Sequence, residues 1–415
     1  MNNSKPYQLR ILVLSLLFTA CSPQQKTGVP VLNWYVFDEQ SGAFREAVEH
    51  CNQAAQDRYR LALTPLPSDA DQQREQLVRR LAAGDKAIDI IGMDVIWTAE
   101  FAQAGWILPW PEIQAARTTT GMLTAAVDSA AYRQKIWGIP FTSNAQLLWY
   151  RKDLISSPAA TWDELITQAE GLDMPGALQV QGQRYEGLTV FFVSLLASAG
   201  GRVLNPQATE VSLPELPTRK ALSILKRIAT SSAADPGLAA SREDQGRLAF
   251  ETGRPALMVN YSYVWPSAQQ NVPQLAEQMA WTRWPSVDKT QPSQVTIGGI
   301  NLAVAAYSRF PDLAYEAIAC LASASNQRIA AQKGGMPPTI KALYADPKIR
   351  QRFPMADDLL ATLENAVQRP QTPVYNDISL AISHTLHPLA QIDPEKDVQR
   401  LRLAVQRALD SEGLF

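Results

Sequence analysis

The feature that most constrains the fold is an alternation of short apolar runs with amphipathic segments in the first quarter of the chain. The apolar, strand-forming runs occupy 31–37, 61–66 and 87–93. The segments between them repeat apolar residues at helical spacing. Because strands of nearly continuous apolar sequence are covered on both faces, the pattern predicts a parallel sheet flanked by helices.

The same alternation continues through the remaining chain. A chain of 415 residues exceeds the size of one small domain, which favours a second α/β unit. Turn-rich or glycine-containing stretches at 138–144 and 295–304 are the predicted crossings between the units. We expect further strands at 145–150, 255–260 and 295–304, and helices at 161–170, 187–199, 218–231, 242–252, 312–322 and near the C-terminus.

Polar side chains follow two of the first three predicted strands. Glu39 and Gln40 come after the first strand, and Asp94 follows the third. Ligands of open α/β sheets bind beyond the carboxyl ends of the strands, so these residues are candidate ligand contacts. The alternatives are structural, because Asp94 could cap the next helix and Glu39 could be a solvated turn residue.

Composition excludes several classes of function. The formal net charge is −2, so no basic excess is available for a nucleic-acid backbone. His384 and His387 have a metal-like spacing but no evident third ligand, and no nucleotide-binding glycine motif occurs. We therefore expect neither a metal nor another cofactor. Ten Trp and twelve Tyr beside three His suit a protein that grips flat apolar faces.

The N-terminus has the pattern of an export signal. Lys5 and Arg10 precede an apolar run at 11–20, which is too short for a permanent bilayer span. Cys21 follows two small residues, as in a bacterial lipobox. We predict a signal peptide at 1–20, lipidation of Cys21 and a polar tether at 21–30. The alternative is ordinary secretory cleavage after Ala20.

Two further cysteines, Cys51 and Cys320, would enter an oxidising compartment. Cys51 lies on an apolar stripe with helical spacing. Sequence alone does not determine cysteine pairing, and we expect two buried thiols rather than a disulfide.

The segment at 89–107 is the most distinctive stretch of the chain. Five further segments accompany it: 137–141, Asn144 with 148–154, 253–260, Gly298 with Gly299, and 373–379. Together these segments resemble one known family, the solute-binding lipoproteins of bacterial ABC importers, in particular the maltose/trehalose-binding group. The segment at 89–107 is similar to trehalose-recognising members.

The resemblance implies two α/β lobes of the type II periplasmic-binding fold, each with a mainly parallel sheet, that close on a disaccharide across a hinge. It implies a first lobe of 31–142 and 299–338 and a second lobe of 143–298 and 339–415. It also implies a monomer anchored by lipid in the cell envelope, with the permease's transmembrane subunits as partner. The implied additional ligand contacts are Trp97, Asn144, Tyr261, Trp265, Gly298, Gly299 and Tyr375.

The chemistry of these side chains suits a neutral sugar. Carboxylates and amides hydrogen-bond hydroxyl groups, and aromatic rings pack on the apolar face of a pyranose. Two alternatives remain: a surface glycoside hydrolase that uses Glu39 and Asp94 as its carboxyl pair, and a binder of another oligosaccharide or a polyol.

Overall fold

The structure is a computed structural model that describes residues 1–2 and 28–411. The predicted cleavage site and Cys21 lie outside the described residues. Among the residues described, no helix is both long and apolar enough to cross a bilayer.

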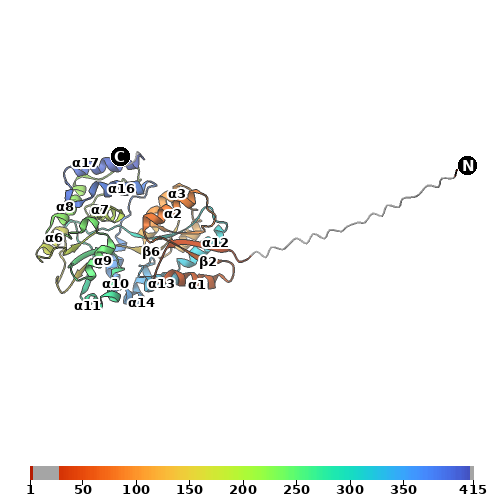
Figure 1. The fold of residues 1–415 in the computed structure, drawn as a ribbon, viewed down its shortest axis with the longest axis horizontal. Helices are drawn as coiled ribbons and strands as arrows, with labels where there is room; N and C mark the ends of the chain where they lie inside the picture. The colour runs from red at the N-terminus through yellow and green to blue at the C-terminus, as the bar shows by residue number, and fades with distance from the viewer. Residues whose placement is uncertain (3–27, 412–415) are drawn as a thin grey trace.

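Two separate sheets, each covered by helices, divide the molecule into two lobes (Figure 1). We call the part built on the five-stranded sheet the first lobe. Its strand order is β2-β1-β3-β11-β6, with β1 at Val31–Phe37, β2 at Arg60–Leu66, β3 at Ile90–Asp94, β6 at Ile139–Asn144 and β11 at Gly298–Val304. β1 is parallel to β2 and β3, and β11 is antiparallel to β3 and β6.

The helices of the first lobe follow the predicted alternation. Asp69 caps α2 by accepting a hydrogen bond from the backbone N–H of Gln72 at 3.1 Å. The helical elements are α1 (Ala43–Ala55), α2 (Ala70–Ala82), the 3-10 turn η1 (Val95–Trp97), α3 (Thr98–Gln103), α4 (Glu112–Thr118), α5 (Thr124–Ser129), α12 (Pro311–Leu321) and α13 (Ala324–Gly334). A short ribbon, β4 (Ala131–Tyr132) and β5 (Lys135–Ile136), precedes β6.

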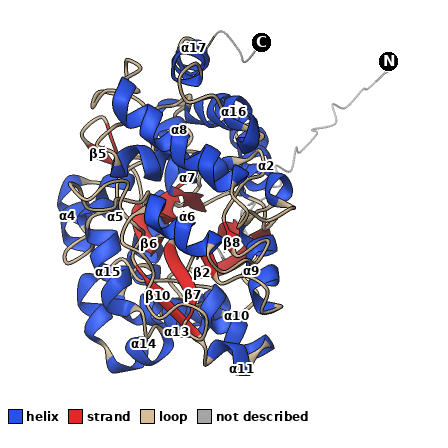
Figure 2. Ribbon diagram, turned by 90° about the vertical axis from the view of Figure 1, so that its left-hand side faces the viewer, coloured by secondary structure: helices blue, strands red, loops and turns tan. Residues whose placement is uncertain are grey.

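The second lobe surrounds a four-stranded sheet (Figure 2). Its strand order is β10-β7-β9-β8, with β7 at Leu147–Arg151, β8 at Leu178–Gln179, β9 at Leu257–Asn260 and β10 at Met279–Thr282. Its helical elements are α6 (Trp162–Glu170), α7 (Glu186–Ser198), α8 (Glu215–Thr230), η2 (Leu238–Ala240), α9 (Glu243–Glu251), α10 (Val264–Asn271), α11 (Pro273–Ala276), η3 (Lys341–Ala345), α14 (Pro347–Arg352), α15 (Ala356–Glu364), α16 (Tyr375–Leu386), η4 (Leu389–Gln391) and α17 (Asp397–Leu409).

The α/β two-lobe prediction is confirmed, but the sheets are mixed rather than mainly parallel. In the second lobe β7 runs antiparallel to both β9 and β10, and the two-residue strand β8 is parallel to β9. An apolar run shows that a strand is buried on both faces but does not show its direction. The long connections between these strands permit either direction, so the sequence left this feature undetermined.

The prediction of two free thiols is wrong. Cys51 on α1 and Cys320 on α12 form a disulfide, with their Cα atoms 5.9 Å apart. The apolar stripe on α1 does bury Cys51, as expected. The stripe did not show that α12, more than 250 residues later, would pack against the same face of α1.

The hydrophobic cores follow the sheets. In the first lobe, one cluster that contains Trp34, Phe44 and Phe141 is separate from another that contains Trp97 and Phe101. The second lobe has one continuous core with members from β7 through α17. Residues of α5 also belong to this second core, although α5 comes before β6 of the first sheet in the sequence.

Candidate ligand-binding site

Asp94 ends β3 and faces the second lobe. Its Oδ1 accepts a hydrogen bond from the backbone N–H of Ile96 at 3.1 Å, and so caps η1. The same oxygen lies 3.5 Å from Nη2 of Arg369. Burial raises the pKa of Asp94, and the Arg369 guanidinium opposes that shift. Asp94 therefore has both the capping role weighed from the sequence and a charged contact across the lobes.

Arg369 is the central cation of the site. It is only 7% exposed, and its Nη1 lies 2.7 Å from Oε1 of Glu186 on α7. Its Nη2 also donates to the carbonyl oxygen of Ile297 at 3.3 Å. One guanidinium thus contacts Asp94 of the first lobe, Glu186 of the second and the backbone that leads into β11. A buried arginine is stabilising only while at least one anionic partner remains beside it.

Glu186 accepts hydrogen bonds from two hydroxyl groups of α16. The Tyr375 hydroxyl donates to Oε1 of Glu186 at 2.5 Å, and the Ser379 hydroxyl donates to Oε2. Burial raises the pKa of Tyr375 well above its usual value, and the Glu186 charge adds to the shift. Tyr375, a candidate from the resemblance, is therefore in this cluster.

The segment after β9 supplies aromatic rings to the same region. Burial raises the pKa of Tyr261, and the nearby charges of Glu243, Asp94 and Glu186 raise it further while Arg369 lowers it. The phenol of Tyr261 thus lies within electrostatic range of both lobes. Trp265 packs edge-on against Trp281, with ring centroids 5.3 Å apart. Its indole Nε1 is buried without a hydrogen-bond partner among the described residues.

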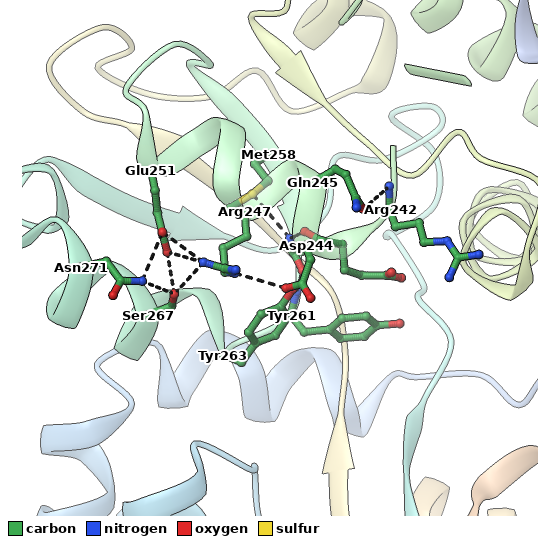
Figure 3. A network of polar contacts seen from close by, with 12 residues as sticks. Arg242, Asp244, Gln245, Arg247, Glu251, Met258, Tyr261, Tyr263, Ser267 and Asn271 are labelled. Atoms are coloured by element: carbon green, nitrogen blue, oxygen red, sulfur yellow. Dashed lines mark hydrogen bonds and ion pairs between the residues drawn. The ribbon is translucent and has the colours of Figure 1, made fainter. Parts of the chain in front are cut away.

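A polar network fixes this aromatic segment to α9 (Figure 3). Nη1 of Arg247 contacts Oε1 of Glu251 at 3.0 Å and the Ser267 hydroxyl on α10 at 3.1 Å. The Tyr263 hydroxyl donates to Oδ1 of Asp244 at 3.1 Å. The network joins α9, which precedes the segment that carries Tyr261, to α10, which follows it.

The glycine pair lies where the chain re-enters the first sheet. Gly298 pairs with Asn144, and Gly299 pairs with Ser143. A Cβ on Gly299 would lie 2.2 Å from the carbonyl oxygen of Thr142, and the φ of Gly299 is 138°, so only glycine fits. Oδ1 of Asn144 is buried and has no hydrogen-bond partner within 28–411, which leaves an acceptor beside this crossing.

The structure gives three other candidates local roles. The carboxylate of Glu39 accepts backbone N–H bonds from Ser41 at 2.7 Å and Ala43 at 2.8 Å, at the start of α1. Gln40 is exposed and donates to Oδ2 of Asp38 at 2.6 Å. Trp97 is 3% exposed and stacks on Phe101 in the first lobe's core. Their roles as ligand contacts remain predictions.

Sequence reasoning missed Arg369 and Glu186. Arg369 follows a helix in a proline-containing segment, and Glu186 begins a nearly all-apolar helix. A lone acidic residue at the start of such a helix also complements the helix dipole, so it carries no specific signal. Only the three-dimensional arrangement shows that the two side chains meet.

The space beside this cluster is small. A cavity of about 10 Å³ is lined by Val95, Ile96, Thr98 and Ala99 of the first lobe, and by Ile297 and 368–371. That volume holds about one water molecule, whereas ligand pockets measure about 300–1,000 Å³. A ligand as large as a sugar does not fit within this cavity.

The fold and the site define a class: a two-lobed protein whose polar cluster, formed by both lobes, lies at their junction. The chain belongs to the bacterial extracellular solute-binding protein family, whose model matches residues 60–328. Within the described residues, no group of three or more His, Cys, Asp or Glu side chains is placed to hold a metal ion.

Individual relatives show the extent of the similarity. A probable ABC transporter-binding protein of Deinococcus radiodurans is 26% identical over 78% of this chain and 80% of its own length. A mannitol-binding protein of Pseudomonas aeruginosa is 23% identical over 46% of this chain and 45% of its own. The solved structure of maltose-bound T. maritima MalE3 matches with a TM-score of 0.80 and 26% identity, over 91% of this chain and 99% of the other.

Proposed function

We propose that the protein is the sugar-binding component of an ABC importer and takes a disaccharide of the trehalose or maltose type between its lobes. The observation that carries the proposal is the Asp94–Arg369–Glu186 cluster, in which charged groups of both lobes meet. The hydroxyl groups of a bound sugar would replace the direct contact between these charged groups with hydrogen bonds. Tyr261 and Trp265 would supply aromatic rings beside the sugar. The maltose-bound structure that this chain resembles supports the sugar class, and the similarity to a probable ABC transporter-binding protein supports the importer role.

Delivery follows from closure of the lobes. Ligand contacts with both lobes favour the closed state, which the importer's transmembrane subunits would recognise. Lipidation at Cys21 would keep a monomeric receptor at the membrane in the cell envelope. The predicted lobe boundaries belong to the same proposal. In its support, β6 of the first sheet ends at Asn144, β7 of the second sheet begins at Leu147, and the chain returns to the first sheet with β11 at Gly298.

Titration calorimetry of the purified protein with trehalose, maltose, sucrose, glucose and mannitol tests the proposal. We expect saturable binding of a disaccharide and no released monosaccharide. Asp94→Asn retains the cap on η1 but removes the charge, and should weaken binding at least about tenfold. Its melting temperature should change little because Glu186 still neutralises Arg369. Asp357→Asn, which removes an exposed charge on α15, is the matched control. Unchanged affinity in Asp94→Asn would remove Asp94 from the site.

Two alternatives are separated by the same experiment. Preferential binding of mannitol would favour a polyol receptor, in line with the Pseudomonas relative. Sugar turnover that Glu39→Gln abolishes would favour a glycoside hydrolase. The backbone hydrogen bonds to both Glu39 oxygens argue for the receptor, since they give this carboxylate a structural role at the start of α1.

A further inference from the structure

A second ion pair joins the lobes away from the Asp94 cluster. Nη1 of Arg242, the residue before α9, lies 3.5 Å from Oδ2 of Asp69, the residue before α2. α2 belongs to the first lobe and α9 packs on β9 of the second. Any separation of the lobes that moves α2 from α9 therefore breaks this pair.

Arg242 is held in place by its own lobe. Its Nε donates to Oε1 of Gln183 at 2.9 Å, and its guanidinium carbon lies 4.6 Å from the centre of the Tyr185 ring. Figure 3 shows the guanidinium directed away from the Arg247 network that anchors α9. Because these contacts already restrict the side chain, meeting Asp69 costs little additional entropy.

Asp69 divides its two oxygens between two tasks. Oδ1 accepts the backbone N–H of Gln72 at 3.1 Å and caps α2, while Oδ2 faces Arg242. The cap orients the carboxylate whether or not the second lobe is near. Both partners are thus positioned before they meet, on opposite lobes.

Arg242 also lies beside the binding cluster. The Tyr185 hydroxyl beneath it donates to Oε2 of Glu243 at 2.6 Å, and the charge of Glu243 acts on Tyr261. We propose that Arg242 and Asp69 form a latch that closes with the lobes and slows ligand release. This inference rests on the proposed function for the identity of the ligand. The closing motion of the latch does not depend on which ligand is bound.

The pair is partly exposed, with 38% of the Arg242 and 37% of the Asp69 side chain accessible. Such pairs contribute modestly and are screened by salt, so we expect an effect of about threefold on release. Asp69→Asn is the informative variant, since asparagine caps a helix as well as aspartate does. Glu75→Gln, which removes an exposed charge from the same helix, is the matched control.

Two measurements test the latch. Small-angle scattering of the ligand-free protein should give a larger radius of gyration for Asp69→Asn and for Arg242→Gln than for the wild type and Glu75→Gln. Stopped-flow measurements should show release of the bound sugar about threefold faster in each single variant than in the wild type. The double variant should release the sugar no faster than the single variants. At about 1 M salt, all the proteins should have equal release rates. Arg242→Lys should restore part of the slow release.

The outcomes separate the two proposals. If the wild type binds no sugar, the proposed function fails, and scattering still tests the latch. Equal radii for all variants, or release rates whose changes multiply in the double variant, would overturn the latch while leaving sugar binding intact.

Discussion

The two lobes bury their apolar residues in different ways. The first lobe has separate core clusters and a disulfide that ties α1 to α12. The second lobe has one continuous core around a mostly antiparallel sheet, and its helix α7 is buried along nearly its whole length. The first lobe thus relies on a covalent link for part of its stability, whereas the second relies on packing.

The difference also divides the site. The first lobe contributes Asp94 from a rigid strand end, and the second contributes Arg369, Glu186 and Tyr375 from helices and a loop. The negative charge of Asp94 in the first lobe is paired with the positive charge of Arg369 in the second. The ionic contacts at the junction therefore require both lobes to be folded.

The largest expected effect breaks the covalent link. Replacing Cys51 and Cys320 together with alanine should lower the stability of the first lobe by about 4 kcal/mol, because the bridge closes a loop with a sequence separation of 269. Differential scanning calorimetry should then show the first lobe melting before the second. Reduction of the wild type should reproduce the shift. A single unshifted transition would show that the lobes do not differ in this way.

The next effect concerns the junction. Arg369→Met removes a buried cation from the partly exposed Asp94 and Glu186 carboxylates, and should cost about 3 kcal/mol. Urea unfolding measures the loss. Arg350→Met, which removes an exposed arginine paired with Asp357, is the control and should change little. A variant at position 369 as stable as the wild type would mean that the packing of the lobes, not this charge, holds the junction.

Much of the first lobe could be predicted because its signals are local. The run at 31–37 is the observed β1, and Asp94 stands at the end of β3 as expected. These features depend on periodicity and on the residues next to them. The predicted helix at 242–252 corresponds to α9 for the same reason.

The rest depends on contacts between distant residues. Three features are decided by packing between residues that lie more than 90 positions apart in the sequence. These are the pairing of Cys51 with Cys320, the direction of β7, and the contact between Arg369 and Glu186. Trp97 illustrates the limit. An aromatic residue after a strand end suits either a ligand or a core, and here its ring stacks on Phe101.

A smaller effect sharpens the comparison at the crossing into β11. Gly299→Ala should cost about 2 kcal/mol, because its Cβ would meet the carbonyl oxygen of Thr142 at a backbone angle that alanine rarely adopts. Gly105→Ala is the matched control, since its φ is also positive but nothing lies within 4 Å. Chemical unfolding of both variants gives the difference. Equal losses would show that the close approach at Gly299 is easily relaxed.

The smallest effect is a pH dependence in the second lobe. Burial raises the pKa of Glu243, although the Tyr185 hydroxyl and Arg242 oppose the shift. The folded state therefore holds this proton more tightly than the unfolded state. The resulting stability is fully present below the unfolded pKa and is lost as pH rises through the folded pKa.

Glu243→Gln removes that dependence while keeping an acceptor for Tyr185. The variant should match the wild type near about pH 4 and melt a few degrees higher than the wild type at about pH 8. Thermal melts across this range measure the difference. Asp244→Asn, a change at the neighbouring exposed residue, should not reproduce the crossover. Parallel curves for Glu243→Gln and wild type would mean that Tyr185 and Arg242 compensate the buried carboxylate fully.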